Sequence, residues 1–100
     1  MRAIGLYPEG WTAWNNLAAL EREAGNIDRA YGILEPLIQT HSHISKINLN
    51  MGLVLEDMGR YEEAYTYIKR SLELDPMYSG AGAHLERVAE KIVKQREAQE

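Results

Sequence analysis

Four acidic side chains are the first candidates for chemistry in this 100-residue chain, because paired carboxylates can serve as general acid and general base. Glu56 and Asp57 are adjacent, and Glu62 and Glu63 follow shortly after them. Catalysis would require these groups to meet in a closed pocket that shifts their pKa values. They lie around a glycine-containing turn, where we expect them to face water. The sequence therefore predicts no catalytic residue and no enzyme activity.

A pair of histidines, His41 and His43, could bind a metal ion if further ligands converged on them. The chain has no cysteine, which excludes disulfides, thiolate metal ligands and cysteine nucleophiles. No acidic cluster adjoins the two imidazoles in the sequence. We interpret the pair as part of a solvated turn and predict no metal site.

Two other features offer weak signals for ligand binding. The run Ser79-Gly80-Ala81-Gly82 is rich in small residues like a phosphate-binding loop, but no strand precedes it and neither glycine fingerprint is complete. We interpret it as the start of a helix. Trp11 and Trp14 could stack on a ligand, but aromatic residues at helical spacing favour a place in the core. No cofactor is predicted.

The composition is that of one ordinary soluble domain. Apolar residues make up 45% of the chain and charged residues 26%. The formal net charge of -4 lacks the basic excess of a phosphate-backbone binder, which argues against nucleic acid as a partner. No apolar run approaches the roughly 20 residues of a membrane span. These observations favour a cytoplasmic protein that binds no membrane.

The elements that would position any site come from an internal repeat. Sliding the sequence against itself by 34 residues aligns similar residues along most of one unit. The aligned pairs are Asn16 with Asn50, Leu17 with Met51, Ala18 with Gly52, Gly25 with Gly59, Ala30 with Ala64, Tyr31 with Tyr65 and Leu34 with Ile68. Such a period indicates units that bury their apolar faces against their neighbours.

Each unit has the apolar spacing of two helices. Ala30, Ile33, Leu34 and Leu37 recur at intervals of three and four residues, which places them on one helical stripe. Trp14, Leu17 and Ala18 form an earlier stripe of the same kind. Gly25 lies between the two stripes, at a position where a helix can end in a left-handed conformation. We therefore predict antiparallel helix pairs.

The pattern resembles the tetratricopeptide repeat. The residues that carry the resemblance are Trp14, Leu17, Ala18, Ala30 and Leu34 in the first copy and Met51, Gly52, Tyr61, Ala64, Ile68 and Leu74-Asp75-Pro76 in the second. The resemblance implies an all-α, right-handed α-solenoid. Residues 1–10 would be the tail of a preceding repeat, 11–44 and 45–78 two full repeats, and 79–100 a capping helix. Glu21, Ser42 and Asn48 depart from the family pattern.

The resemblance also implies a binding groove. In this family the first helix of each pair lines a concave surface that holds a protein or peptide partner. Carried over to this chain, the groove residues are Asn15, Asn16, Arg22, Lys46, Leu49, Asn50, Leu53, His84 and Arg87.

Asn16 and Asn50 occupy the same position in the two copies. An asparagine amide can both donate to and accept from the backbone of an extended peptide. The pair is similar to the asparagines in the tetratricopeptide arm of O-linked N-acetylglucosamine transferases, whereas the third such position here is His84. Solvated asparagines without a binding role are an equally open interpretation.

The function predicted from the sequence is a protein-protein interaction module that binds an extended peptide or a partner helix in its concave groove. A second hypothesis is self-assembly, because apolar repeat ends could be covered by another copy of the chain. A third is that the chain is a docking arm cut from a larger enzyme.

Overall fold

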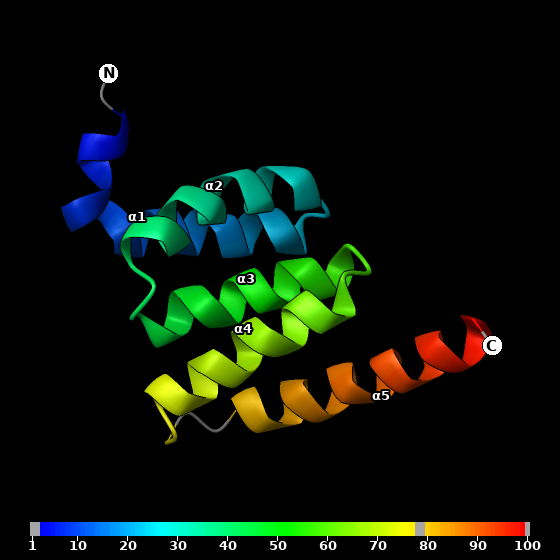
Figure 1. Ribbon diagram of the computed structural model, residues 1–100. Helices are drawn as coiled ribbons and strands as arrows, with labels where there is room; N and C mark the ends of the chain where they lie inside the picture. Colours follow the sequence, from blue (N-terminus) through cyan, green and yellow to red (C-terminus); the bar gives the residue numbers. More distant parts are fainter. Residues whose placement is uncertain (1–2, 78–79, 100) are drawn as a thin grey trace.

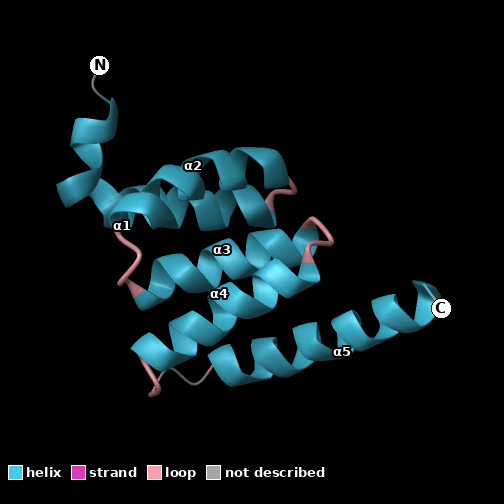
Figure 2. Cartoon of the chain, viewed as in Figure 1, coloured by secondary structure: helices cyan, strands magenta, loops and turns pink. Residues whose placement is uncertain are grey.

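Helices account for most of the described residues. The structure, a computed structural model, describes residues 3–77 and 80–99, with side chains from residue 10 onward. Within these residues the order is α1 (Ala3–Glu23), α2 (Ile27–Thr40), α3 (Ser45–Asp57), α4 (Tyr61–Leu74) and α5 (Ala81–Gln99), joined by short loops (Figures 1 and 2). The part of the chain described contains no strand. The predicted all-α solenoid of antiparallel helix pairs is confirmed.

Glycine ends the first helix of each pair. Gly25 and Gly59 have φ values of 90° and 83°, in the left-handed region that L side chains rarely adopt. The amide of Asn26 bonds to the carbonyl of Glu21 at 2.8 Å, and the amide of Arg60 bonds to Leu55 at 2.9 Å. This six-to-one hydrogen bond defines a Schellman motif, which satisfies carbonyls at the helix end. The two predicted helix turns therefore have the same geometry.

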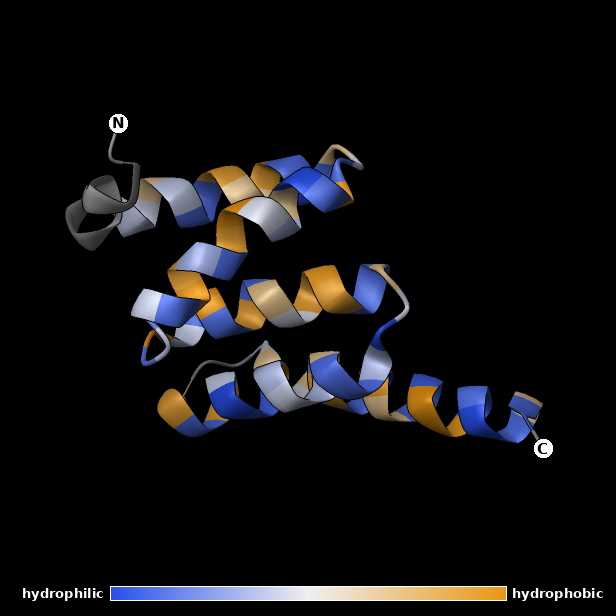
Figure 3. Cartoon of the chain, turned by 45° about the horizontal axis from the view of Figure 1, so that its top comes forward, coloured by the Kyte–Doolittle hydropathy of each residue, from blue (hydrophilic) through white to orange (hydrophobic). Residues whose placement is uncertain are grey.

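Helix α3 lies at the centre of the solenoid. It packs against α1, α2 and α4, so most of its residues are buried, including Ile47, Val54 and Leu55. Apolar and hydrophilic segments alternate along the helices (Figure 3). Because each unit covers only its neighbours, the molecule is elongated, with extents of 48 × 29 × 21 Å.

Asn48 stands where the tetratricopeptide pattern usually has an aromatic residue. Its side chain is fully buried, and Nδ2 donates to the carbonyls of Ser42 and Ile44, each at 2.9 Å. The amide therefore holds the loop between α2 and α3 against the start of α3. This departure from the family pattern replaces apolar packing with hydrogen bonds.

The ends of the chain differ in detail from the predicted repeat division. Helix α1 is continuous from Ala3 to Glu23, so no loop separates residues 3–10 from the first repeat. Figure 1 shows its first turns at an angle to the remainder. In α5, Val88 is buried, whereas Val93 is 55% exposed. No described helix combines the length and apolar character of a transmembrane span.

Helices α3 and α4 approach each other closely at Gly52 in α3. A Cβ atom there would lie 2.5 Å from Cγ1 of Ile68 and 3.1 Å from the backbone oxygen of Ala64. Because a backbone oxygen cannot rotate away, any side chain at residue 52 would push α4 outward. Gly52 therefore sets the distance between α3 and α4.

We predict that Gly52→Ala lowers the free energy of unfolding by about 1–3 kcal/mol through overpacking. The matched control is Gly32→Ala in α2, where an added Cβ would meet no atom within 4 Å. There the higher helix propensity of alanine should raise stability by up to about 1 kcal/mol. Thermal and urea unfolding of the two variants measures both effects. Equal stability changes of the same sign would contradict the proposed contact.

Candidate functional site

The first helices of the two pairs, α1 and α3, and the last helix, α5, are linked by polar side chains, and we call this surface the first-helix face. Asn50 bonds to Asn15, Arg22 to Asp57 and Lys91 to Glu56. In every case the two partners are 35 residues apart. This separation is one residue longer than the 34-residue sequence repeat. A residue on one of these helices therefore does not contact its repeat equivalent on the next helix, but the residue one position away from it.

The asparagine pair predicted from the sequence is arranged differently in the structure. Asn50 donates from Nδ2 to Oδ1 of Asn15 at 3.0 Å, and Asn15 is only 3% exposed. Asn16 is exposed, and its side chain makes no hydrogen bond to another described residue. Asn50 therefore retains a second amide hydrogen and its own oxygen, while Asn16 retains its full donor and acceptor capacity.

Charged groups on the first-helix face are paired with one another. Nε of Arg22 lies 2.6 Å from Oδ2 of Asp57. Glu56 receives two hydrogen bonds from Arg87 and one from Lys91, each at 2.7 Å. The expectation that Glu56 faces water is wrong, because its residue is only 5% exposed and its carboxylate joins α3 to α5.

This pairing controls the protonation of the site. The hydrogen bonds from Arg87 lower the pKa of Glu56 from 4.5 to about 2, against the opposing effect of burial, and Lys91 acts in the same direction. The same bonds to Glu56 raise the pKa of Arg87. Burial, followed by the charge of Arg87, lowers the pKa of His84. At neutral pH the face thus carries an ionised carboxylate beside a neutral imidazole.

His84 also has a defined tautomer. Its Nδ1 lies 2.9 Å from a guanidinium nitrogen of Arg87. A guanidinium can only donate hydrogen bonds, so Nδ1 is the acceptor and the ring proton is on Nε2. His84 therefore has one N–H donor for a ligand.

The remaining predicted groove residues fall into two groups. Leu49 and Leu53 are buried, so they form the base of the face rather than an open apolar wall. Lys46 is exposed at the start of α3. The structure places Asn15, Asn50, Arg22 and Arg87 in three separate side-chain contacts between neighbouring helices, whereas Asn16 and Lys46 take part in none of them.

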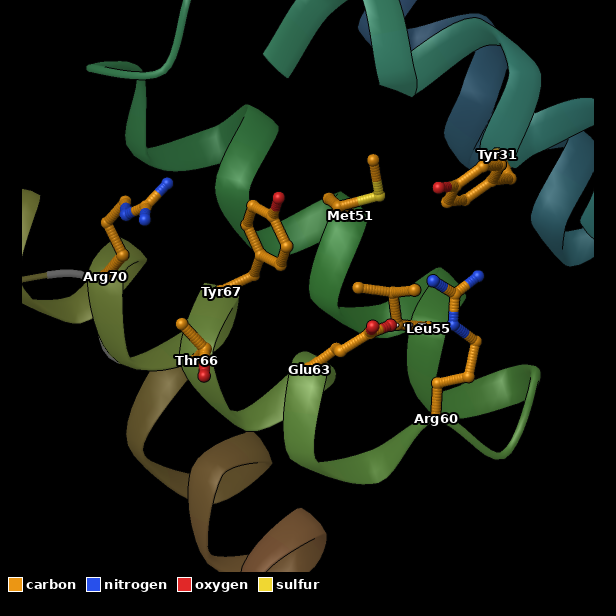
Figure 4. A pocket seen from close by; sticks show the side chains of 8 residues that line it. All are labelled: Tyr31, Met51, Leu55, Arg60, Glu63, Thr66, Tyr67 and Arg70. Atoms are coloured by element: carbon orange, nitrogen blue, oxygen red, sulfur yellow. Dashed lines mark hydrogen bonds and ion pairs between the residues drawn. The ribbon is translucent and has the colours of Figure 1, made fainter. Parts of the chain in front are cut away.

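A second candidate surface was not predicted from the sequence. A cleft of about 250 Å³ opens between α2 and α4, and we call it the α2–α4 cleft (Figure 4). It is lined by Tyr31, Met51, Leu55, Arg60, Glu63, Thr66, Tyr67 and Arg70. The sequence did not predict the cleft, because tyrosines at helical spacing usually belong to the core. The alternation of Tyr67 with Arg60 and Arg70 along the sequence was the one pattern that could have indicated a binding surface here.

The histidine pair shows no arrangement that favours metal binding. His41 contacts the hydroxyl of Thr40 at 2.8 Å, and its ring lies 6.3 Å from the rings of Trp11 and His43. Residues 3–77 and 80–99 contain no group of three or more potential metal-binding side chains. Of the glycine-rich run, Ser79 lies outside the described residues, and α5 begins at Ala81.

Comparison with known proteins supports the repeat assignment. The model of the tetratricopeptide repeat family matches residues 45–78. Comparison of the sequence with curated proteins gives no match. The fold is similar to that of "MamA 41-end from Desulfovibrio magneticus RS-1", with a TM-score of 0.71 and 18% sequence identity. The match covers 96% of this chain and 60% of that structure, and at this identity it shows the fold alone.

We predict that Glu56→Gln lowers the free energy of unfolding at pH 7 by about 1–2 kcal/mol, because it removes the negative charge and one acceptor oxygen from a buried group whose charged donors are themselves partly exposed. The folded pKa of about 2 lies below the ordinary 4.5, so this stabilisation is present above pH 4.5 and is lost as the pH falls to 2. The difference between the two proteins should therefore shrink over that range. Urea unfolding at several pH values measures it, with exposed Glu86→Gln as the control; a constant difference would contradict the assignment.

Proposed function

We propose that this chain, in which residues 45–78 form a tetratricopeptide repeat within a solenoid of the same type, binds an extended segment of a partner protein on its first-helix face. The family is one of protein-interaction modules, which supports a protein partner. On the first-helix face, side-chain contacts join α1 to α3 and α3 to α5. A partner segment laid across it would contact the whole solenoid.

The observation that carries the proposal is the contrast between charges and amides on this face. Arg22, Asp57 and Glu56 are already engaged in ion pairs within the protein. Asn16 and Asn50 still have donors and acceptors for a ligand. Amides suit the N–H and C=O groups of a peptide backbone, whereas paired charges add little attraction for a charged side chain.

This arrangement favours recognition of the partner's backbone over recognition of its charge. Asn16 is on α1, Asn50 on α3 and His84 on α5, so each helix supplies one side chain with an available N–H group. The N–H and C=O groups of an extended segment recur at regular intervals. Side chains on successive helices can therefore form hydrogen bonds with successive parts of its backbone. Ordering a flexible segment costs entropy, and we expect moderate affinity.

A peptide-display selection tests this proposal. Peptides enriched on the wild-type protein should bind Asn16→Ala and Asn50→Ala about threefold to tenfold more weakly each, as expected for the loss of one or two hydrogen bonds. Asn16→Ala removes no contact within the protein, whereas Asn50→Ala also removes the bond to Asn15, so its melting curve must be measured. Gln39→Ala, which deletes an exposed amide from α2, is the control.

Two results would contradict the proposal. One is equal binding of the selected peptides to the wild-type protein and to Asn16→Ala. The other is a steep loss of affinity with added salt, which would mean that charges rather than amides carry the binding.

Self-assembly is a second candidate function, favoured by apolar side chains at both ends of the solenoid. Leu17 and Leu20 on α1 are 39% and 62% exposed, and Val93 on α5 is also exposed. In a repeat array such residues are covered by the adjoining unit. A second copy of the chain could take that place in an end-to-end contact.

If copies associate in this way, the mass measured by light scattering should rise with protein concentration. Leu20→Lys should reduce this rise because it places a charge in the apolar contact. Exposed Lys94→Gln changes the net charge of α5 without removing an apolar group and is the control. A single monomeric mass at all concentrations would exclude the self-assembly proposal.

A further inference from the structure

The α2–α4 cleft combines an apolar floor with a cation at each end. Met51 and Leu55 of α3 form the buried floor, and Tyr31 and Tyr67 are half-buried beside it. Figure 4 shows Arg60 and Arg70 at opposite ends of the cleft, with Tyr67 between them. An apolar pocket with a few converging polar groups is the usual form of a binding site.

The two arginines differ in what they already bind. Arg60 lies 2.6 Å from the carboxylate of Glu63, and its guanidinium lies 5.5 Å from the ring centre of Tyr31. Arg70 stacks on Tyr67 at 5.3 Å and forms no ion pair with any described residue. One end of the cleft is thus neutralised by the protein itself, while the other keeps an uncompensated positive charge.

A purely structural role does not account for Arg70. Arg60 connects α4 to Tyr31 of α2, so it contributes to the packing of one repeat on the next. Tyr67 and Arg70 are both on α4, three residues apart, so their contact joins no two helices. Stacking on the ring nevertheless holds the guanidinium in place, which lowers the entropic cost of binding an anion.

The surroundings preserve this positive charge. An adjoining hollow shares Arg70 and adds Lys69 and Glu73, which have opposite signs. Within the cleft itself Arg60 and Arg70 face only one acid, Glu63. The local excess is therefore one positive charge, although the whole chain has a net charge of -4. The cleft is therefore positive although the chain as a whole is negative, and its charge complements that of an acidic ligand.

We propose that the α2–α4 cleft is a second docking site, which binds a partner segment carrying an acidic residue next to an aromatic one. The aromatic side chain packs on Met51 and Leu55, between the two tyrosine rings. The carboxylate pairs with Arg70, whose planar guanidinium suits bidentate contact. A volume of about 250 Å³ is enough for one large side chain together with part of its neighbour. This site is independent of the first-helix face.

The test compares two peptides that differ in charge alone, Ac-Phe-Glu-NH2 and Ac-Phe-Gln-NH2, titrated into the ¹⁵N-labelled full chain. The glutamate peptide should shift amide signals of α2 and α4 around the cleft and bind about two- to fivefold more tightly, as expected for a partly exposed ion pair. Arg70→Gln should abolish this preference. Lys94→Gln on α5, which removes the same charge far from the cleft, should leave it unchanged.

Glu63→Gln provides a test in the opposite direction. Removing this carboxylate frees Arg60, so the preference for the glutamate peptide should increase. Asn16→Ala, which alters the other surface, should have no effect. Equal binding of the two peptides to the wild-type protein would overturn the proposal. So would a preference that persists in Arg70→Gln, or signal shifts confined to α1 and α5.

Discussion

Helices α3 and α4 can pack closely only because Gly52 has no side chain. Its α-carbon lies against the backbone of Ala64 and the side chain of Ile68, both fully buried. This close contact leaves the other sides of α3 available to α1 and α2. The result is a central helix covered on several sides, so the buried polar residues of α3 need partners on a neighbouring helix or loop.

Three of these residues bond to three different neighbours, although the buried Oδ1 of Asn48 has no partner among the described residues. Asn48 bonds to the preceding loop, Asn50 bonds to α1, and Glu56 bonds to α5. Glu56 illustrates the energetic balance, since burial alone would raise its pKa and the cations of α5 lower it to about 2. Ion pairs within the protein engage most of the charged side chains on the first-helix face. They leave amide groups for a partner, which is the basis of the proposed backbone recognition.

The two surfaces of the solenoid therefore differ in chemistry. On the first-helix face, both carboxylates are held in ion pairs with cations of neighbouring helices, and amide groups remain beside them. In the α2–α4 cleft, one arginine is neutralised by Glu63 while Arg70 is held by an aromatic ring. The proposed partners differ accordingly, because one surface suits a peptide backbone and the other an acidic side chain next to an aromatic ring. A repeat domain with both could hold two segments at once.

The helix pairs, their glycine turns and the 34-residue unit could be predicted from the sequence, because they depend on residues close together along the chain. Gly25 and Gly59 have the left-handed conformation that ends a helix, and Ala30 and Ala64 are fully buried. The partner of each groove residue was decided by the tertiary structure. The sequence repeat pairs Asn16 with Asn50, whereas packing places Asn50 against Asn15, because the register between adjacent helices depends on how their side chains interlock. The burial of Glu56 and the α2–α4 cleft have the same origin, since both form only where separate units meet.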